Sequence, residues 1–350
     1  MSRFLTLILC VSFVAPVLNA DERIDDLTQD SLQEAFRVLQ KNYIRQEDLS
    51  YEELNRAALD GLLRRLNLGA RLVSKDGAAA DDGPEVEFYT DIITPTIGYL
   101  RLAEYSMDEL DDFDDALSSF EDAEVETLVL DLRAPQVNAD LNAAARILDR
   151  FVPANTLLFK IQKPQAKRPQ MYFSQASNQI WEDDLVLLID EETSNAGEVV
   201  AALLNQMRDC VVVGSKTPGA TVEYEQIALN EETFLKYAVA EVVLADESPL
   251  YLVGVEPDFE VEQDPEAKIK VYDSTKAGPI HQHIFEQARP RMNEAALVHE
   301  TDPELDYHLA RSRGEITEFD RVPLQDRVLQ RAVDMLLTSA HFNSPADQAE

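Results

Sequence analysis

The 350-residue sequence is poor in cysteine and in basic residues, and each shortage narrows what the protein can be. It has two cysteines, Cys10 and Cys210. Cys10 lies in an apolar N-terminal run that is typical of a cleaved signal peptide, and the chain that is left after cleavage has one cysteine and cannot form an internal disulfide. The other, Cys210, precedes a valine run and is predicted to be a buried, inert thiol. The sequence has 31 basic and 66 acidic residues, which gives a net charge of −35. Nucleic acid and anionic membrane both need a basic face, so neutral or basic partners are favoured.

Long hydrophobic runs are also scarce. The run over residues 4–17 follows Arg3 and precedes Ala20, a pattern typical of a cleavable signal peptide over residues 1–20. The run is too short for a comfortable membrane span. We therefore expect a secreted or periplasmic protein with no membrane contact after signal cleavage.

The most informative segment lies between residues 184 and 216. An apolar run at 185–189 predicts a buried strand, and a run at 211–213 predicts a second one. Between them, an acidic turn leads into a helix with one apolar stripe, made of Val200, Leu203, Leu204 and Met207. This order places a helix N-terminus at the carboxyl edge of a sheet, where a nucleophile or a bound anion can be held.

Four short motifs share one order and spacing with a known family. They are G-Y-L-R at 98–101, L-D-L-R at 130–133, A-G-E-V-V at 196–200 and G-V-E-P-D at 254–258. Together they resemble the C-terminal processing (tail-specific) serine peptidases, which use a Ser/Lys dyad. The resemblance implies a mixed α/β fold, a sheet-plus-helices core of the tail-specific protease or crotonase-like type.

The resemblance also identifies the reactive positions, and all three are changed. In the family the nucleophilic Ser stands three residues before the Glu, here Glu198, so its position is Asn195. The Lys position falls on Ala220 and the Gln position on Tyr224. A Ser/Lys peptidase needs a hydroxyl and an amine that can be neutral, so the resemblance implies that the dyad is lost. On its residue type alone, Asn195 is predicted to be a helix cap.

Ser194 and Lys216 are the alternative dyad, displaced by one and four residues. A one-residue shift at a helix start rotates a side chain by about 100°, which favours a cap hydroxyl and a surface lysine instead. The family's Gly turn after L-D-L-R is replaced by residues 134–138, which contain no Gly. This replacement indicates a loop of another shape than the one that helps to form the family's oxyanion hole.

No cofactor or metal is expected. His281 and His283 share a face only on a strand, and no further ligand cluster accompanies them, so they are predicted to be polar surface residues. The sequence has no phosphate-binding Gly loop and no HExxH motif.

The predicted organisation has five parts. These are a signal peptide (1–20), an N-terminal helical region (21–74), a linker or loop too short for the PDZ domain usual in the family (75–96), a tail-specific protease-like core (97–262), and a polar C-terminal extension ending in a helix (263–350).

Three functions are compatible with this sequence. The first is a non-catalytic pseudopeptidase that binds a peptide or protein partner in the former substrate groove, by strand addition. The second is an active serine-type peptidase with a rearranged site that uses Ser194. The third is a structural or assembly subunit whose helical ends form a homo-oligomer.

Overall fold

The computed structural model describes residues 28–45, 48–75, 86–135, 140–175, 181–284, 302–314 and 324–343. The expected signal peptide and residues 136–138 of the expected oxyanion loop lie outside these ranges. The chain divides into two units, residues 1–67 and 68–350. Within the described ranges, no helix is both long enough and apolar enough to span a bilayer.

The described part of the first unit contains two helices, α2 (Gln29–Asn42) and α3 (Tyr51–Leu66), as the sequence predicts. Each begins at a hydroxyl cap. Thr28 Oγ1 accepts a hydrogen bond from the backbone N–H of Ser31 at 3.2 Å, and Ser50 Oγ accepts one from Glu53 at 3.1 Å.

A six-stranded sheet forms the centre of the second unit. Its strand order is β11-β8-β7-β4-β3-β2. All neighbours are parallel except β2, which runs antiparallel to β3 at one edge. The strands are β2 (Tyr89–Thr94), β3 (Ile97–Arg101), β4 (Thr127–Asp131), β7 (Asp184–Ile189), β8 (Val211–Gly214) and β11 (Phe259–Glu260).

The predicted linker at 75–96 is wrong where β2 lies. Residues 89–94 pair with β3, because a strand at the edge of an otherwise parallel sheet can be joined to its neighbour by a tight turn. Residues 76–85 lie outside the described ranges.

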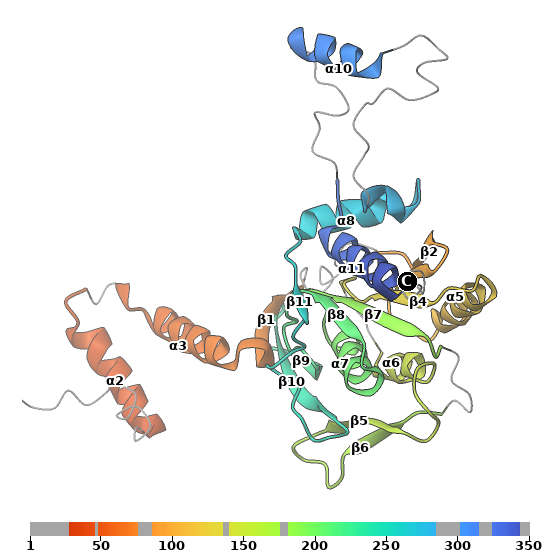
Figure 1. Ribbon diagram of the computed structural model, residues 1–350. Coiled ribbons are helices and arrows are strands. Elements are labelled where there is room, and N and C mark those ends of the chain that lie inside the picture. The colour runs from red at the N-terminus through yellow and green to blue at the C-terminus, as the bar shows by residue number, and fades with distance from the viewer. Residues whose placement is uncertain are drawn as a thin grey trace, which may run out of the picture. The chain divides into compact units, whose positions relative to one another are not determined.

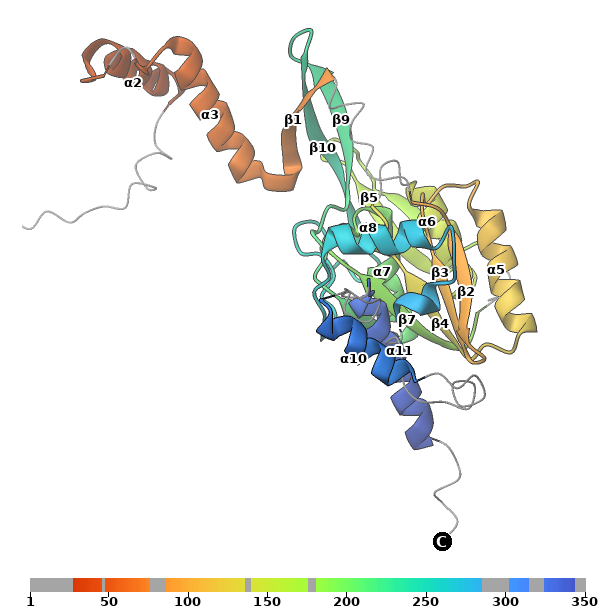
Figure 2. The ribbon, with the colours of Figure 1, turned by 90° about the horizontal axis from the view of Figure 1, so that it is seen from above.

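Helices cover both faces of this sheet (Figures 1 and 2). On one face lie α5 (Leu110–Asp122), α6 (Leu141–Leu148) and α7 (Ala196–Arg208); on the other lie α8 (Pro265–Ser274), the 3₁₀ turn η3 (Ile280–His283) and α11 (Arg327–Asn343). The strands supply both cores by alternation. In β4, Leu128 and Leu130 pack toward the first group of helices, and Val129 packs toward the second.

Three elements of the C-terminal segment, α8, η3 and α11, are therefore part of the core, and the prediction of a polar extension over 263–350 is wrong for them. The final helix is confirmed as α11, and a further helix, α10 (Pro303–Ser312), precedes it. A parallel sheet is apolar on both faces and needs a cover on each. The residues that supply this cover on the second face are Val271, Ile280, Ile284, Val328, Leu329, Ala332 and Val333.

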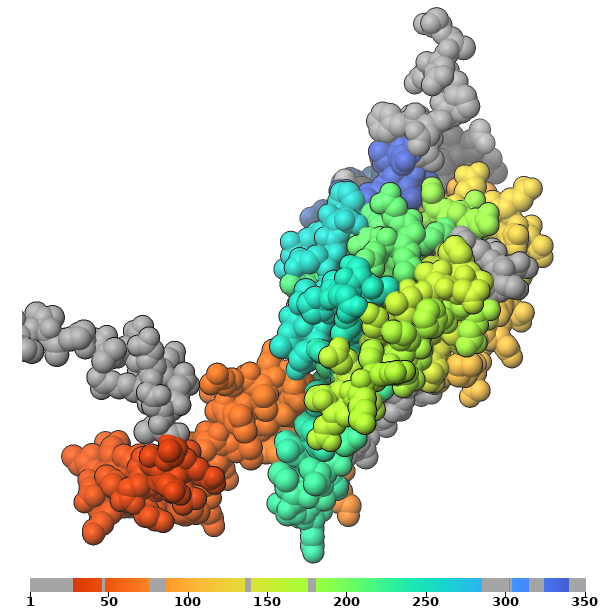
Figure 3. Space-filling model, turned by 90° about the horizontal axis from the view of Figure 1, so that it is seen from below, coloured from red at the N-terminus to blue at the C-terminus, as the bar shows by residue number. Residues whose placement is uncertain are grey.

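A second sheet has the strand order β1-β10-β5-β6, with β9 paired to β10. Its strands are β1 (Ala70–Ser74), β5 (Leu157–Gln162), β6 (Gln170–Phe173), β9 (Val222–Ala228) and β10 (Thr233–Leu244), and the 3₁₀ turn η2 (Asn67–Gly69) precedes β1. The last five residues of the predicted helical region thus form a strand, because Ala70–Ser74 pair with β10. Figure 3 shows the β5–β6 hairpin, in yellow-green, beside the teal strands of this sheet.

Candidate ligand-binding site at the start of α7

The site begins at a fixed turn between β7 and α7. Asp190 Oδ1 accepts hydrogen bonds from the backbone N–H groups of Glu192 at 2.9 Å and Thr193 at 3.2 Å. The Thr193 hydroxyl donates to the carbonyl oxygen of Leu132 at 2.9 Å. These hydrogen bonds stabilise the turn internally and hold it against the residues that follow the neighbouring strand β4.

Asn195 follows this turn in a strained backbone conformation. Its φ of 46° and ψ of −108° lie outside the extended region that a capping residue normally adopts. It occupies the N-cap position, but its side chain makes no capping hydrogen bond, so the predicted capping role is wrong. A non-glycine residue held in such a conformation costs on the order of 1–3 kcal/mol, and strain of this kind is characteristic of functional sites.

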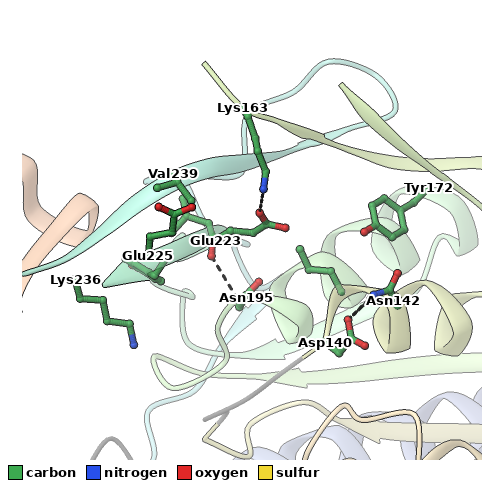
Figure 4. Close-up of a pocket in the computed structure, with 12 residues that line it drawn as sticks. Asp140, Asn142, Lys163, Tyr172, Asn195, Glu223, Glu225, Lys236 and Val239 are labelled. Carbon is green, nitrogen blue, oxygen red and sulfur yellow. Dashed lines mark hydrogen bonds and ion pairs between the residues drawn. The ribbon is translucent and has the colours of Figure 1, made fainter. Parts of the chain in front are cut away.

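The side chain of Asn195 is directed at β9 instead (Figure 4). Its Nδ2 donates to the carbonyl oxygen of Val222 over 3.5 Å, a long hydrogen bond. Its Oδ1 is buried and has no hydrogen-bond partner in the described part of the chain. A buried acceptor without a donor is costly, so this oxygen is available to a ligand that brings an N–H group.

Glu198 connects the start of α7 to the loop that carries Ala220. The carboxylate is fully buried and accepts hydrogen bonds from Thr217 Oγ1 at 2.6 Å, Gly219 N at 2.5 Å and Ala220 N at 2.6 Å. It also accepts one from the backbone N–H of Asn195. Burial raises the pKa of Glu198, while these donors act in the opposite direction. One carboxylate thus holds both positions 195 and 220.

Two glycines explain why the segments around 217–220 and 252–255 keep a fixed spacing. Gly254 has a φ of +72°, and a Cβ atom there would lie 2.2 Å from the carbonyl oxygen of Thr217. Gly219 has a φ of +76°, and a Cβ atom there would lie 2.7 Å from the backbone nitrogen of Val253. The two backbones approach too closely for any other residue at either position.

A cavity of about 440 Å³ opens beside Asn195 (Figure 4). It is bounded by α6, α7, the β5–β6 hairpin and the β9–β10 pair. Three carboxylates, two amines and two phenols contribute to its wall. The lining residues are Asp140, Leu141, Asn142, Lys163, Tyr172, Asn195, Val222, Glu223, Tyr224, Glu225, Lys236 and Val239.

Comparison with known proteins agrees with this architecture. Residues 96–261 match the family model described as peptidase family S41. The chain carries a peptidase family S41 domain. The domain includes the strained turn, Glu198 and both glycines of the close backbone approach.

Similarity to individual proteins is low but extended. The carboxyl-terminal-processing protease of Synechocystis is 24% identical over 48% of this chain and 38% of that protein. The carboxy-terminal-processing protease of Bartonella bacilliformis is 25% identical over 63% of this chain and 53% of that protein. The chain thus spans about a third to a half of the length of these curated relatives. A crystal structure of a predicted peptidase from Parabacteroides merdae has a TM-score of 0.52 at 16% identity, covering 70% of this chain and 85% of that one, which supports the fold.

Within the S41 domain, the three changed positions have different surroundings. Asn195 and Tyr224 line the cavity, and the Tyr224 hydroxyl donates to the carbonyl oxygen of Leu68 at 2.7 Å. Ala220 is held by Glu198 but is not among the lining residues.

The alternative dyad is not brought together at the cavity. Lys216 Nζ lies 2.6 Å from Glu256 Oε1 in an exposed ion pair. Neither Lys216 nor Ser194 belongs to the cavity lining. These placements agree with the plainer prediction of a surface lysine for Lys216.

Two lysines that the sequence did not single out as site residues do reach the cavity. Lys163, from the β5–β6 hairpin, lies 2.8 Å from Glu223 Oε2, and this hydrogen bond raises the pKa of Lys163. A raised pKa keeps the amine protonated, the reverse of what a general base needs. Lys236 Nζ lies 5.3 Å from the centre of the Tyr224 ring, within range of a cation–π contact.

A buried charge network behind the turn was missed by sequence reasoning. Arg133 of the L-D-L-R motif is fully buried between two carboxylates. Its Nη2 atom lies 2.6 Å from Asp131 Oδ2 and 2.7 Å from Asp326 Oδ2. Burial alone would raise the pKa of Asp131, but the charge and hydrogen bonds of Arg133 outweigh it and lower that pKa to about 2. The network joins the end of β4 to the start of α11.

Lys268 of α8 completes this attachment. Its buried ammonium donates to Asp190 Oδ2 at 2.5 Å, Glu192 Oε2 at 2.6 Å and the carbonyl oxygen of Arg133 at 2.7 Å. The C-terminal segment therefore holds the same β7–α7 turn that presents Asn195. The partners lie 76 to 135 residues apart in sequence, so no local pattern could indicate them.

The remaining candidate residues have structural surroundings. Cys210 is buried, which raises the pKa of its thiol to about 12, as expected for an inert cysteine. His283 is half-buried rather than on the surface, with Nε2 lying 2.6 Å from Ser274 Oγ. Among the described residues, no group of three or more His, Cys, Asp or Glu side chains could hold a metal.

Proposed function

We propose that this protein is a non-catalytic member of the tail-specific peptidase family that holds an extended peptide or protein segment in the cavity beside Asn195. One observation carries the proposal: the twelve residues that line the cavity include no Ser, Thr or Cys. Acyl transfer by a Ser/Lys mechanism needs a hydroxyl or thiol nucleophile with an amine base beside it. Asn195 supplies an amide there, and Ala220 has no titratable group.

The edge of β9 supports binding of an extended segment. In the described part of the chain β9 pairs only with β10, which leaves its other edge without a strand partner. Residues 222–225 of β9 line the cavity. A bound segment can add to such an edge through main-chain hydrogen bonds, and the unpaired Oδ1 of Asn195 offers a further acceptor for an N–H of that segment. The net charge of −35 favours a neutral or basic segment.

Activity measurements test the loss of catalysis. Purified protein is expected to turn over no unstructured peptide and to take no fluorophosphonate label, because no Ser, Thr or Cys is among the described residues that line the cavity. Turnover that disappears in Ser194→Ala would overturn the proposal in favour of a rearranged serine peptidase. In a second arm, Asn195→Ser, Ala220→Lys and Tyr224→Gln are combined, and a gain of turnover is expected if these positions alone separate the chain from an active enzyme.

Binding is tested separately from catalysis. Fluorescence anisotropy with a library of labelled, unstructured peptides is expected to give saturable binding by the wild-type chain. Val239→Trp, which fills the cavity wall, should weaken it at least ~10-fold. Ile227→Trp is the matched control, since Ile227 lies on β9 outside the cavity lining and is 53% exposed. Equal affinity of the two variants would place the binding surface elsewhere.

We also propose that residues 1–20 direct export, so that the protein acts outside the cytoplasm. N-terminal sequencing of protein recovered from the native envelope or medium should begin at Asp21. Recovery of chains that still begin at Met1 would contradict this.

A further inference from the structure

A second cavity lies on the face of the second sheet that points away from the core. Three alternate residues of β10 pack into the core, namely Ala240, Val242 and Leu244. Glu241 lies between the first two, so its side chain points away from the core. The cavity around it has a volume of about 370 Å³, and we call it the outer cavity. Its lining residues are Gln162, Pro164, Val222, Ala238, Val239, Ala240, Glu241 and Tyr251.

The wall of the outer cavity combines apolar surface with three polar side chains, those of Glu241, Gln162 and Tyr251. Within the described residues, none of these three side chains has a hydrogen bond or an ion pair. Burial, and after it the charge of Glu241, raises the pKa of Tyr251, so the phenol lies within electrostatic reach of that carboxylate. Three polar groups thus face the cavity ready to bind a ligand.

The nearest lysines of β5 and its hairpin do not neutralise Glu241. Lys160 forms an ion pair with Glu247. Lys163 forms one with Glu223. A cavity with apolar walls and one carboxylate that lacks a counter-ion suits a cation carried on an aliphatic stem.

The strand register connects the outer cavity to the free edge of β9. Glu241 pairs with Val222 of β9 on one side and with Gln162 of β5 on the other. Paired residues point to the same face of a sheet, so these three side chains form one row across three strands. Val222 and Val239 also line the cavity beside Asn195. The two cavities therefore adjoin each other at β9 and β10.

A segment added to the free edge of β9 extends this row by one position. Strands lie about 4.8 Å apart, so a residue that pairs with Val222 lies about 10 Å from the backbone of Glu241. A short side chain cannot cover that distance. A Lys or Arg side chain can lay its aliphatic stem over Val222 and bring its charge to the Glu241 carboxylate. The Gln162 amide oxygen and the Tyr251 hydroxyl offer acceptors for the remaining N–H groups.

We propose that the outer cavity is a specificity site that takes a Lys or Arg side chain of the segment bound along β9. The proposal rests on the proposed function, because the segment must occupy the β9 edge to present that side chain. A neutral side chain leaves Glu241 without a counter-ion, and an acidic one meets a like charge. The site therefore selects segments with a basic residue at one position.

Fluorescence anisotropy with two matched sets of labelled, unstructured peptides tests the proposal. The sets differ only in carrying Arg or citrulline at each basic position, a change that removes the charge and keeps the size. Measurements are made at physiological ionic strength, which screens distant charges. The wild-type chain is expected to bind its best Arg peptide about 10-fold more tightly than the citrulline counterpart.

Two variants locate the origin of this preference. Glu241→Gln should reduce it to less than about 2-fold while leaving the affinity for the citrulline peptide unchanged. Glu231→Gln removes the same charge from the exposed turn between β9 and β10, outside the lining of both cavities, and should keep the preference. Peptides that bind without an Arg preference, or with one that Glu241→Gln retains, would overturn this inference alone. Failure of every peptide to bind would overturn the proposed function and this inference with it.

Discussion

Asp326 offers a sharp test of how the C-terminal segment is attached to the sheet. Its carboxylate accepts hydrogen bonds from the Arg133 guanidinium at 3.0 and 2.7 Å, and both side chains are fully buried. It also accepts one at 2.9 Å from the backbone N–H of Leu329, in the first turn of α11. Asp326→Asn keeps the size and an acceptor for the cap but removes the charge. Asp326→Ala removes both.

The magnitudes follow from burial. Removing one partner of a buried ion pair costs about 3–5 kcal/mol, because the other charge is left uncompensated. Arg133 retains Asp131, so we expect a loss of about 3 kcal/mol for Asp326→Asn. Loss of the cap adds about 1 kcal/mol for Asp326→Ala. The control is Glu256→Gln, whose ion pair with Lys216 is exposed and contributes less than about 1 kcal/mol.

Urea unfolding measures these differences. Trp181 is the only tryptophan and is buried in the core on the opposite face of the sheet from α11, so its fluorescence reports unfolding of the domain. Circular dichroism should change together with it if α11 and the sheet unfold as one unit. An Asp326→Asn variant as stable as Glu256→Gln would refute the claim that this ion pair attaches the C-terminal segment. A helical transition well before the fluorescence change would show that α11 detaches by itself.

Three further experiments have defined outcomes. In Glu198→Gln, an amide N–H₂ group replaces a carboxylate oxygen and faces backbone N–H donors, so the free energy of unfolding should fall by about 2–4 kcal/mol. An unchanged thermal midpoint would show that this carboxylate does not stabilise the segments at 195 and 217–220. The pKa of Asp131 is lowered from 3.8 to about 2, so its contribution of about 2 kcal/mol is present above pH 4 and lost as the pH falls toward 2. Acid unfolding of Asp131→Asn should lack this component; an identical pH profile would count against it. Cys210 should resist iodoacetamide at pH 8 in the folded protein and react fully in denaturant, whereas rapid labelling of the folded state would show that the thiol is accessible.

Some features of the site could be predicted because they are local or depend on spacing. Short apolar runs identified β7 and β8, and the stripe from Val200 to Met207 identified α7. The order and spacing of the motifs that contain Glu198 and Gly254 located positions 195 and 220. The structure gives the cause of that spacing, since the carboxylate and the two close backbone approaches allow little variation in length.

Other features depended on context that the sequence does not display. Asn is a residue type that is common at helix N-caps, but the backbone of Asn195 lies outside the φ/ψ region that capping residues adopt. The strand at 89–94 lies beside a segment rich in Gly and Asp, and its pairing with β3 decided its conformation. Lys163 and Lys236 reach the cavity only because a hairpin and a distant strand are neighbours in the second sheet.

The sequence by itself determined the family, the order of the central elements and the chemistry missing at positions 195 and 220. Each of these depends on residue type, periodicity or a fixed interval along the chain. Only the tertiary structure decided that α8, η3 and α11 are part of the core, that Lys268 holds the β7–α7 turn, and that Asp326 pairs with Arg133 beside the end of β4. Their polar partners lie up to 193 residues away, and a charged side chain becomes a buried ion pair only after the sheet has brought its partner within hydrogen-bond distance.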